Sequence, residues 1–74
     1  MKNNKKITIG TSIDEIDMSA RLRNLLLDHN IGTLKEVLIV GKKEFETSRN
    51  MGKKTFAELE ELLARASVDW NTEV

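Results

Sequence analysis

The sequence predicts an all-α protein, and three observations support this fold class. Leu, Glu, Lys and Ala are common among the 74 residues, whereas strand signals are scarce. Apolar residues recur at helical spacing over residues 53–66. Two Asn-apolar-Gly turns, at residues 30–32 and 50–52, each open an apolar-periodic segment. We therefore predict a compact bundle of four helices plus a short irregular helical turn, arranged as paired helix-hairpin-helix-like units.

One helical turn and one helix are predicted in the first half of the sequence. Residues 12–16 fit a single turn that points Ile13 and Ile16 inward. Ser19 is a good N-cap, so a helix is expected over residues 19–29. Its inner face carries the residues at i, i+3, i+4 and i+7, which are Leu22, Leu25, Leu26 and His29. A second face is polar and expected to be exposed, with Arg21, Asn24 and Asp28.

Three more helices are predicted in the second half. Thr33 begins a capping box with Glu36, so one helix is expected over residues 33–40. The next is expected over residues 42–48, with Phe45 as its one clear anchor. The last runs over residues 53–66 with the apolar stripe Phe56, Leu59, Leu62, Leu63 and Ala66. The predicted core contains Leu26, Leu34, Leu38, Phe45, Phe56, Leu59 and Leu63.

The protein is expected to form one domain. We predict a flexible basic tail over residues 1–11, a helical domain over residues 12–70 and a short tail over residues 71–74. Trp70 is expected to fold back as a lid on the core. Since no apolar run approaches the length of a membrane span and no signal-peptide core follows the N-terminus, a cytoplasmic location is predicted.

The composition argues against catalysis and metal binding. The sequence has no Cys and a single His29, so neither a disulfide nor a metal centre is expected. Asp14, Glu15 and Asp17 lie close in sequence, but no base or metal ligand accompanies them there. We expect no enzyme activity, no cofactor and no small-molecule substrate.

The last predicted turn and helix have the character of an anion site. Gly52 is expected to form a tight turn, because glycine adopts a positive φ without steric cost. The first turn of the following helix has free backbone N–H groups and the positive end of the helix dipole. Lys53 and Lys54 flank this end, which suits a phosphate. The net charge of zero, however, argues against a purely electrostatic nucleic-acid binder.

These motifs together resemble the C-terminal domain of the bacterial RNA polymerase alpha subunit. The similarity covers residues 12–66 and combines an Arg-x-x-Asn pair with an Asn-apolar-Gly-Lys-Lys-Ser/Thr turn. The residues that carry it are 13–21, Asn24, Leu26, 31–34, 49–56, Glu58 and Leu59. The resemblance implies a compact bundle of helices that binds A·T-rich promoter DNA through the minor groove and contacts transcription factors and sigma.

The resemblance also implies roles for individual residues. Arg21 matches the arginine that enters the minor groove, with Asn24 beside it. Gly52, Lys54 and Thr55 match contacts to the DNA phosphates, and Glu58 matches an acidic position next to them. From the residues alone, Arg21 and Asn24 lie one helical turn apart, and an arginine suits the negative potential of a narrow A·T minor groove.

The sequence departs from the family pattern at several positions. Gly41 stands where a capping Thr or Ser is usual, and Glu46 and Ser48 replace apolar residues, so the helix over 42–48 is expected to be loosely held. Leu27 replaces a usual Lys or Arg and is a possible protein contact. The sequence begins at Met1 without a preceding assembly domain, which favours a free-standing bacterial or phage protein over an excised fragment.

Two functions are compatible with these features. The first is a DNA-binding transcription module that recognises A·T-rich double-stranded promoter DNA. The second is a protein-interaction module that binds a transcription factor, sigma or RNA polymerase without binding DNA itself. Arg21, Asn24 and the turn at Gly52 favour the first, while Leu27 and the neutral net charge favour the second.

Overall fold

The computed structural model describes residues 7–49 and 51–73, which form four α-helices and one 3₁₀ turn. In sequence order these elements are η1 (Ile13–Glu15), α1 (Ala20–Asp28), α2 (Leu34–Val40), α3 (Lys42–Glu46) and α4 (Lys53–Arg65). The all-α prediction is confirmed, and the ends of the helices differ from the predicted ones by at most two residues, as is usual for helix termini. Within the described residues, the only β-pairing is an isolated bridge between Ser12 and Thr33.

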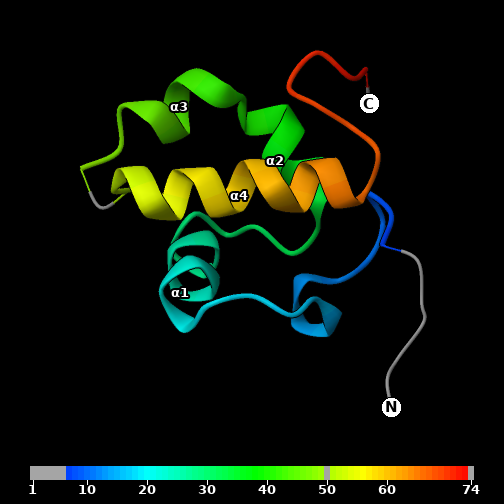
Figure 1. Ribbon diagram of the computed structural model, residues 1–74, viewed down its shortest axis with the longest axis horizontal. Helices are drawn as coiled ribbons and strands as arrows, with labels where there is room; N and C mark the ends of the chain where they lie inside the picture. The colour runs from blue at the N-terminus through cyan, green and yellow to red at the C-terminus, as the bar shows by residue number, and fades with distance from the viewer. Residues whose placement is uncertain (1–6, 50, 74) are drawn as a thin grey trace.

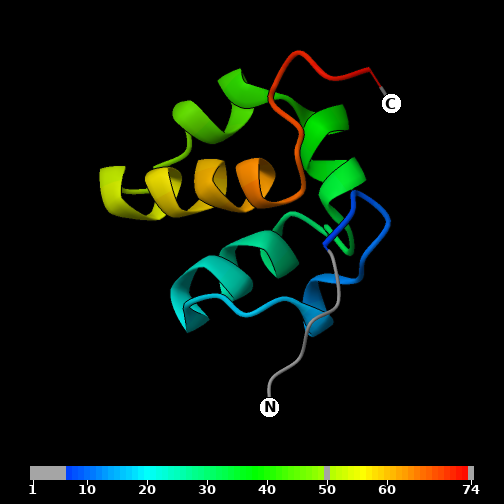
Figure 2. The ribbon, with the colours of Figure 1, turned by 45° about the vertical axis from the view of Figure 1, so that its right-hand side comes forward.

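The four helices form two helix hairpins. We call α1, residues 29–33 and α2 the first hairpin, and α3, residues 47–52 and α4 the second hairpin. Figure 1 shows α4 running through the middle of the molecule, with α3 alongside it and α1 against its opposite side. Figure 2 gives the same order of α1, α4 and α3 from another direction. Of the second turn, Asn50 lies outside the described residues.

Local sequence explains where α1 and α2 begin. The Ser19 hydroxyl accepts a hydrogen bond from the Leu22 N–H, which satisfies one of the donors that have no partner in the first helical turn. Thr33 begins α2 with a capping box, in which the Glu36 carboxylate accepts from the Thr33 N–H at 3.1 Å. Both predicted caps are confirmed.

The core forms as the helical spacing predicts. Leu26, Leu34, Phe45, Leu59 and Leu63 are fully buried and Leu38 is nearly so. Phe56 is the exception among the predicted core residues, because it is only half-buried at the edge of this cluster. The core also contains residues from the turns and from α4, among them Ile31, Met51 and Leu62.

Two predictions about particular residues are wrong. Gly52 has φ −74° and ψ 169°, so it is an extended N-cap and needs no positive φ. The positive φ values fall instead on Asn30, Gly41 and Ser67. His29 is exposed at the end of α1 and does not complete its inner face, although its ring lies edge-on to Phe45 with centroids 5.3 Å apart.

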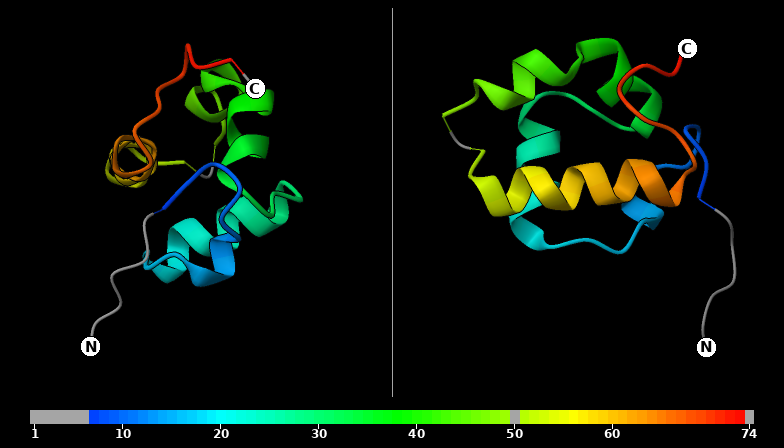
Figure 3. Two further views of the ribbon diagram at one scale, coloured as in Figure 1. Left: turned by 90° about the vertical axis from the view of Figure 1, so that its right-hand side faces the viewer. Right: turned by 45° about the horizontal axis from the view of Figure 1, so that its top comes forward.

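The two ends of the described polypeptide pack against the helices. Residues 1–6 of the predicted tail and Val74 lie outside the described residues, but Ile7 and Ile9 pack on the core. The Ile9 carbonyl also accepts from the Lys35 N–H at 2.9 Å, so this part of the expected tail belongs to the folded unit. Figure 3 shows these residues passing close to the end of α4.

The C-terminal segment covers the aromatic side of the core, as predicted for Trp70. The indole is stacked on Phe56 with ring centroids 6.0 Å apart and an angle of 10° between the rings. It also lies 6.1 Å from Phe45, and its Nε1 donates to Glu60 Oε2 at 2.9 Å. No helix within the described ranges is long and apolar enough to span a bilayer.

Candidate nucleic-acid interface

The start of α4 lacks the caps that close the starts of α1 and α2. Its N-cap is Gly52, which has no side chain to cap the helix, and its first turn contains no acidic residue. Gly52, Lys53 and Lys54 are all exposed. The first N–H groups of an α-helix have no acceptor within the helix, and they carry the positive end of its dipole. This end of α4 can therefore accept an external anion.

Arg21 and Asn24 lie on the exposed face of α1. Both side chains are exposed, whereas Leu22, Leu25 and Leu26 on the opposite face are buried in the core. Burial of these three leucines fixes the rotation of α1, so that Arg21 and Asn24 must point to solvent one helical turn apart. The predicted polar face is confirmed.

Glu58 joins the start of α1 to α4. Its carboxylate accepts from the Ser19 N–H at 2.8 Å and from the Ser19 hydroxyl at 2.6 Å. A carboxylate at a helix N-terminus is favoured by the dipole, and hydrogen bonds to a charged group are stronger than neutral ones. Because Ser19 directly precedes the first turn of α1, this contact ties the helix that carries Arg21 to α4.

The same contact shows on which side of α4 Lys54 lies. Lys54 and Glu58 are four residues apart and share one face of α4, and Glu58 points to the start of α1. Lys54 therefore lies on the side of α4 that faces α1, one turn closer to Gly52. Arg21 and Asn24 thus lie on α1 and Gly52 and Lys54 at the start of α4, the two helices that the contact between Ser19 and Glu58 joins. Figure 1 shows α1 and α4 packed against each other.

Thr55 is less accessible than its predicted role requires. Only 6% of its surface is exposed, because it packs into the interior at the third position of α4. Its backbone N–H, by contrast, belongs to the first helical turn and has no acceptor within the helix. Any contact between this residue and an anion is therefore expected to go through the backbone and not through the hydroxyl.

Arg23 is a positioning residue that the sequence alone did not reveal. Its Nη1 donates to the Ile13 carbonyl and its Nη2 to the Ile16 carbonyl, each at 2.9 Å. These bonds fasten η1 to α1, and the Ile13 carbonyl accepts from the Ile16 N–H as well. The signal was available in principle, since Arg23 lies between the polar and apolar faces of the predicted helix.

Among the described residues, two large apolar side chains are exposed. Leu27 near the end of α1 is 51% exposed, which confirms the expectation that it faces solvent. Ile39 on α2 is 63% exposed and was not expected. Single exposed apolar residues are common on protein surfaces, so neither of them defines a binding site by itself.

Comparisons with known proteins agree with the geometry. The family model of the C-terminal domain of the bacterial RNA polymerase alpha chain matches residues 1–65. The DNA-directed RNA polymerase subunit alpha of Mycoplasmoides gallisepticum is 36% identical over 63 residues, which is 85% of this protein and 19% of the relative. The same subunit of Chloroherpeton thalassium is 33% identical over 73 residues, 99% of this protein and 22% of the relative.

A third relative gives the same result. The subunit alpha of Dehalococcoides mccartyi is 39% identical over 61 residues, covering 82% of this protein and 18% of the relative. The sequence thus spans about a fifth of the length of these polymerase subunits. No solved structure matches it.

Proposed function

The protein belongs to the family formed by the C-terminal domain of the bacterial RNA polymerase alpha subunit, and we propose that it binds A·T-rich promoter DNA through the minor groove. Family membership links it to transcription. In the proposed complex, Arg21 enters the minor groove with Asn24 beside it, and the start of α4 at Gly52 and Lys54 contacts the phosphates. The role is one of binding in the cytoplasm, without catalysis.

The observation that carries this proposal is the contact between Glu58 and Ser19. It holds an exposed arginine on α1 at a defined position relative to an uncapped, lysine-flanked helix start on α4. Phosphate contacts fix the register of a protein on DNA, while the groove contact carries the sequence preference. Glu58 is then a positioning residue, which acts through α1 and does not itself touch DNA.

The decisive experiment titrates wild type and Arg21→Ala with A·T-rich and G·C-rich duplexes. Arg21→Ala should remove the preference for A·T-rich DNA, because the guanidinium senses the potential of the narrow groove. Arg21→Lys should also lose much of it, since an ammonium is more strongly hydrated. If Arg21→Ala binds each duplex as tightly as wild type does, or if neither protein binds either duplex at low salt, the proposed mode of DNA binding is refuted.

Lys54→Ala provides the matched control. It should weaken binding about equally on both duplexes, because a phosphate carries no sequence information. With only Arg21 and Lys54 as cationic contacts, the log–log salt slope should be shallow, roughly −2. A single domain should therefore bind weakly, and useful affinity would need a second copy or a protein tether.

Leu27 supports a second function, contact with a transcription factor, sigma or RNA polymerase. An apolar side chain that is half exposed stands where the family usually carries a charge. Leu27→Lys should leave DNA binding intact or slightly stronger, while weakening a protein contact made through this part of α1. If neither duplex binds and Leu27→Lys disrupts association with the polymerase, the interaction module replaces the DNA-binding module.

A further inference from the structure

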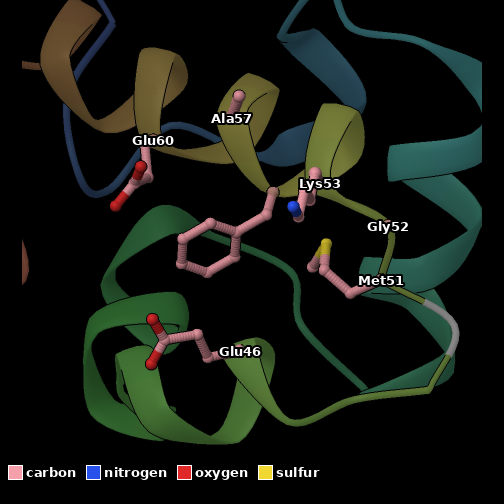
Figure 4. Close-up of a pocket in the computed structure, with 7 residues that line it drawn as sticks. Glu46, Met51, Gly52, Lys53, Ala57 and Glu60 are labelled. Carbon is pink, nitrogen blue, oxygen red and sulfur yellow. The ribbon is translucent and has the colours of Figure 1, made fainter.

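A hollow of about 420 Å³ lies between α3 and α4, on the side of α4 away from Glu58. Its lining consists of Glu46, Met51, Gly52, Lys53, Phe56, Ala57 and Glu60. Figure 4 shows Glu46 on α3 and Glu60 on α4 facing the hollow from its two sides, with Met51 and Lys53 toward the turn. Its volume falls at the low end of pockets that hold a small ligand, which measure about 300–1,000 Å³.

The hollow exists because α3 supplies little apolar surface beyond Phe45. The next residue, Glu46, is exposed and carries a charge, so it leaves the neighbouring ring of Phe56 half uncovered. Trp70 stacks on one face of Phe56 and is not among the residues that line the hollow. The exposed part of Phe56 and the neighbouring apolar side chains thus form the floor of the hollow, which remains open to solvent beside the carboxylates of Glu46 and Glu60.

The charges around this floor select the ligand. Glu46 and Glu60 outweigh the single ammonium of Lys53, so the rim favours a cation. Glu60 is already oriented, because its Oε2 accepts from the Trp70 indole at 2.9 Å. The floor of Met51, Phe56 and Ala57 favours methylene groups.

We propose that this hollow binds an arginine side chain of a protein partner, presented between aliphatic neighbours. The guanidinium would lie near Glu46 and Glu60, its methylenes would cover Met51 and Ala57, and its plane would stack on the exposed part of Phe56. Arginine suits such a site better than lysine, because its planar group stacks on aromatic rings and is less strongly hydrated. The neighbouring aliphatic side chains would cover the rest of the floor.

This site adjoins the proposed phosphate contact, because Gly52 and Lys53 at the start of α4 line the hollow. Its remaining residues are not among the proposed DNA contacts. Phe56, Ala57 and Glu60 lie on one side of α4, whereas Lys54 and Glu58 face α1. Arg21 lies on α1 and does not line the hollow. Arg21→Ala should therefore leave binding at the hollow unchanged, so loss of the groove contact and loss of binding at the hollow can be told apart.

Trp70 makes the proposal measurable on the whole protein. It is the only tryptophan in the sequence and contacts both Phe56 and Glu60, so its fluorescence reports on the hollow. The probe is the acetylated and amidated pentapeptide Ala-Leu-Arg-Leu-Ala, compared with versions that carry Lys or Gln in place of Arg. We expect a saturable change with Arg, a weaker one with Lys and none with Gln, together with amide NMR shifts at Met51, Phe56 and Ala57.

Matched substitutions test the carboxylates. Glu46→Gln keeps the size of the side chain but removes its charge, and should weaken binding of the Arg peptide about two- to fivefold, as expected for an exposed ion pair. Glu44→Gln removes another exposed carboxylate of α3 that does not line the hollow, and should change nothing. Glu46→Leu should fill the hollow and abolish binding while the protein stays folded.

Three results would overturn the proposal. The first is the absence of a saturable signal with the Arg peptide in the millimolar range. The second is equal binding of the Arg and Gln peptides, or equal effects of Glu46→Gln and Glu44→Gln. The third is a set of NMR shifts on another face, or self-association of the protein that accounts for the signal without peptide.

Discussion

The two hairpins follow the same Asn-apolar-Gly pattern, but they differ in the acceptors that they provide for the backbone N–H groups at the start of the second helix. In the first hairpin, the Glu36 carboxylate accepts from the N–H groups of Gly32 and Thr33. In the second, the N-cap Gly52 has no side chain to cap α4, and the first turn of α4 contains no acidic residue. The first hairpin thus carries its own anion, whereas Gly52 and the first turn of α4 supply none.

This difference is the reason that we assign the proposed phosphate contact to the second hairpin and not to the first. A phosphate approaching the start of α2 would meet a carboxylate that already occupies the N–H groups. At the start of α4 it would meet Lys53 and Lys54, exposed beside the positive end of the dipole. Basic residues are unfavourable at such an end unless an anion is bound, so under the proposed mode of DNA binding the second hairpin is less stable without the phosphate.

The hairpins also differ in how firmly their shorter helices are held. α2 buries Leu34, Val37 and Leu38, whereas α3 buries Phe45 alone. The Phe45 side chain is 0% exposed and its ring contacts His29 and Trp70. The attachment of α3 therefore depends on a single side chain, and the expectation of a loosely held helix agrees with this packing.

Phe45→Ala should produce the largest change in stability. Removing a fully buried phenylalanine costs about 3–5 kcal/mol in unfolding free energy. Domains of this size have a total of about 4–11 kcal/mol at the usual 0.05–0.15 kcal/mol per residue. Chemical denaturation followed by Trp70 fluorescence would measure the loss. Phe56→Ala is the comparison, with an expected cost of about 2 kcal/mol because Phe56 is only half-buried.

Equal losses for the two phenylalanines would contradict the view that Phe45 anchors α3. So would a Phe45→Ala variant whose unfolding free energy stays within about 1 kcal/mol of wild type, since buried aromatic truncations cost several times more. A third possibility sharpens the comparison. If α3 alone becomes accessible to hydrogen exchange in Phe45→Ala, the second hairpin opens locally without global unfolding.

The sequence was sufficient for the parts of the fold that depend on local pattern. Helical periodicity identified the buried leucines of α1 and α4, and cap residues identified the starts of α1 and α2. These signals lie within one or two turns of the residues they concern. The exposed position of Arg21 follows from the same periodicity, because a residue opposite a buried face must point to solvent. The exposure of Leu27 is expected instead from the resemblance, since Leu27 replaces a usual Lys or Arg.

The parts that were missed depend on contacts between distant residues. Glu58 bonds to Ser19 across 39 positions, and no local pattern reveals that pair. Arg23 bonds to carbonyls of η1, whose position relative to α1 is set by tertiary packing. A positive φ is predicted for Gly52 because glycine permits one. The backbone instead enters α4 with Gly52 as N-cap in an extended conformation, which any residue can adopt.

Glu36→Ala should cause an intermediate change, confined to the first hairpin. It removes the acceptor of two backbone N–H groups and should lower the unfolding free energy by about 1–2 kcal/mol. DNA affinity should stay the same, because Glu36 lies in the other hairpin from the proposed phosphate contacts. Glu44→Ala is the control, an exposed carboxylate without a capping bond, expected to stay within about 0.5 kcal/mol. A Glu36→Ala variant as stable as Glu44→Ala would show that the cap is unimportant.

Gly52→Asp should change stability least and in the opposite direction, while weakening DNA binding. The φ of −74° suits any residue, and a Cβ at Gly52 would meet no atom within 4 Å. Aspartate is a better N-cap than glycine by a few tenths of a kcal/mol, and the positive end of the helix dipole stabilises its negative charge. The unfolding free energy should therefore rise by about 0.5–1 kcal/mol.

The same aspartate would occupy the position that we assign to a phosphate. Two like charges about 4 Å apart repel by about 1–4 kcal/mol between the limits of bulk water and a protein surface, which corresponds to a loss of at least about fivefold in affinity. Gly52→Asn separates the two effects, because it caps the helix without a charge and should lose less affinity. Paired melting and titration experiments would decide, since only an anion site predicts that a better cap makes a more stable protein and a poorer DNA binder. If Gly52→Asp binds DNA as tightly as Gly52→Asn, the start of α4 is not a phosphate contact, and the second hairpin is open for another reason.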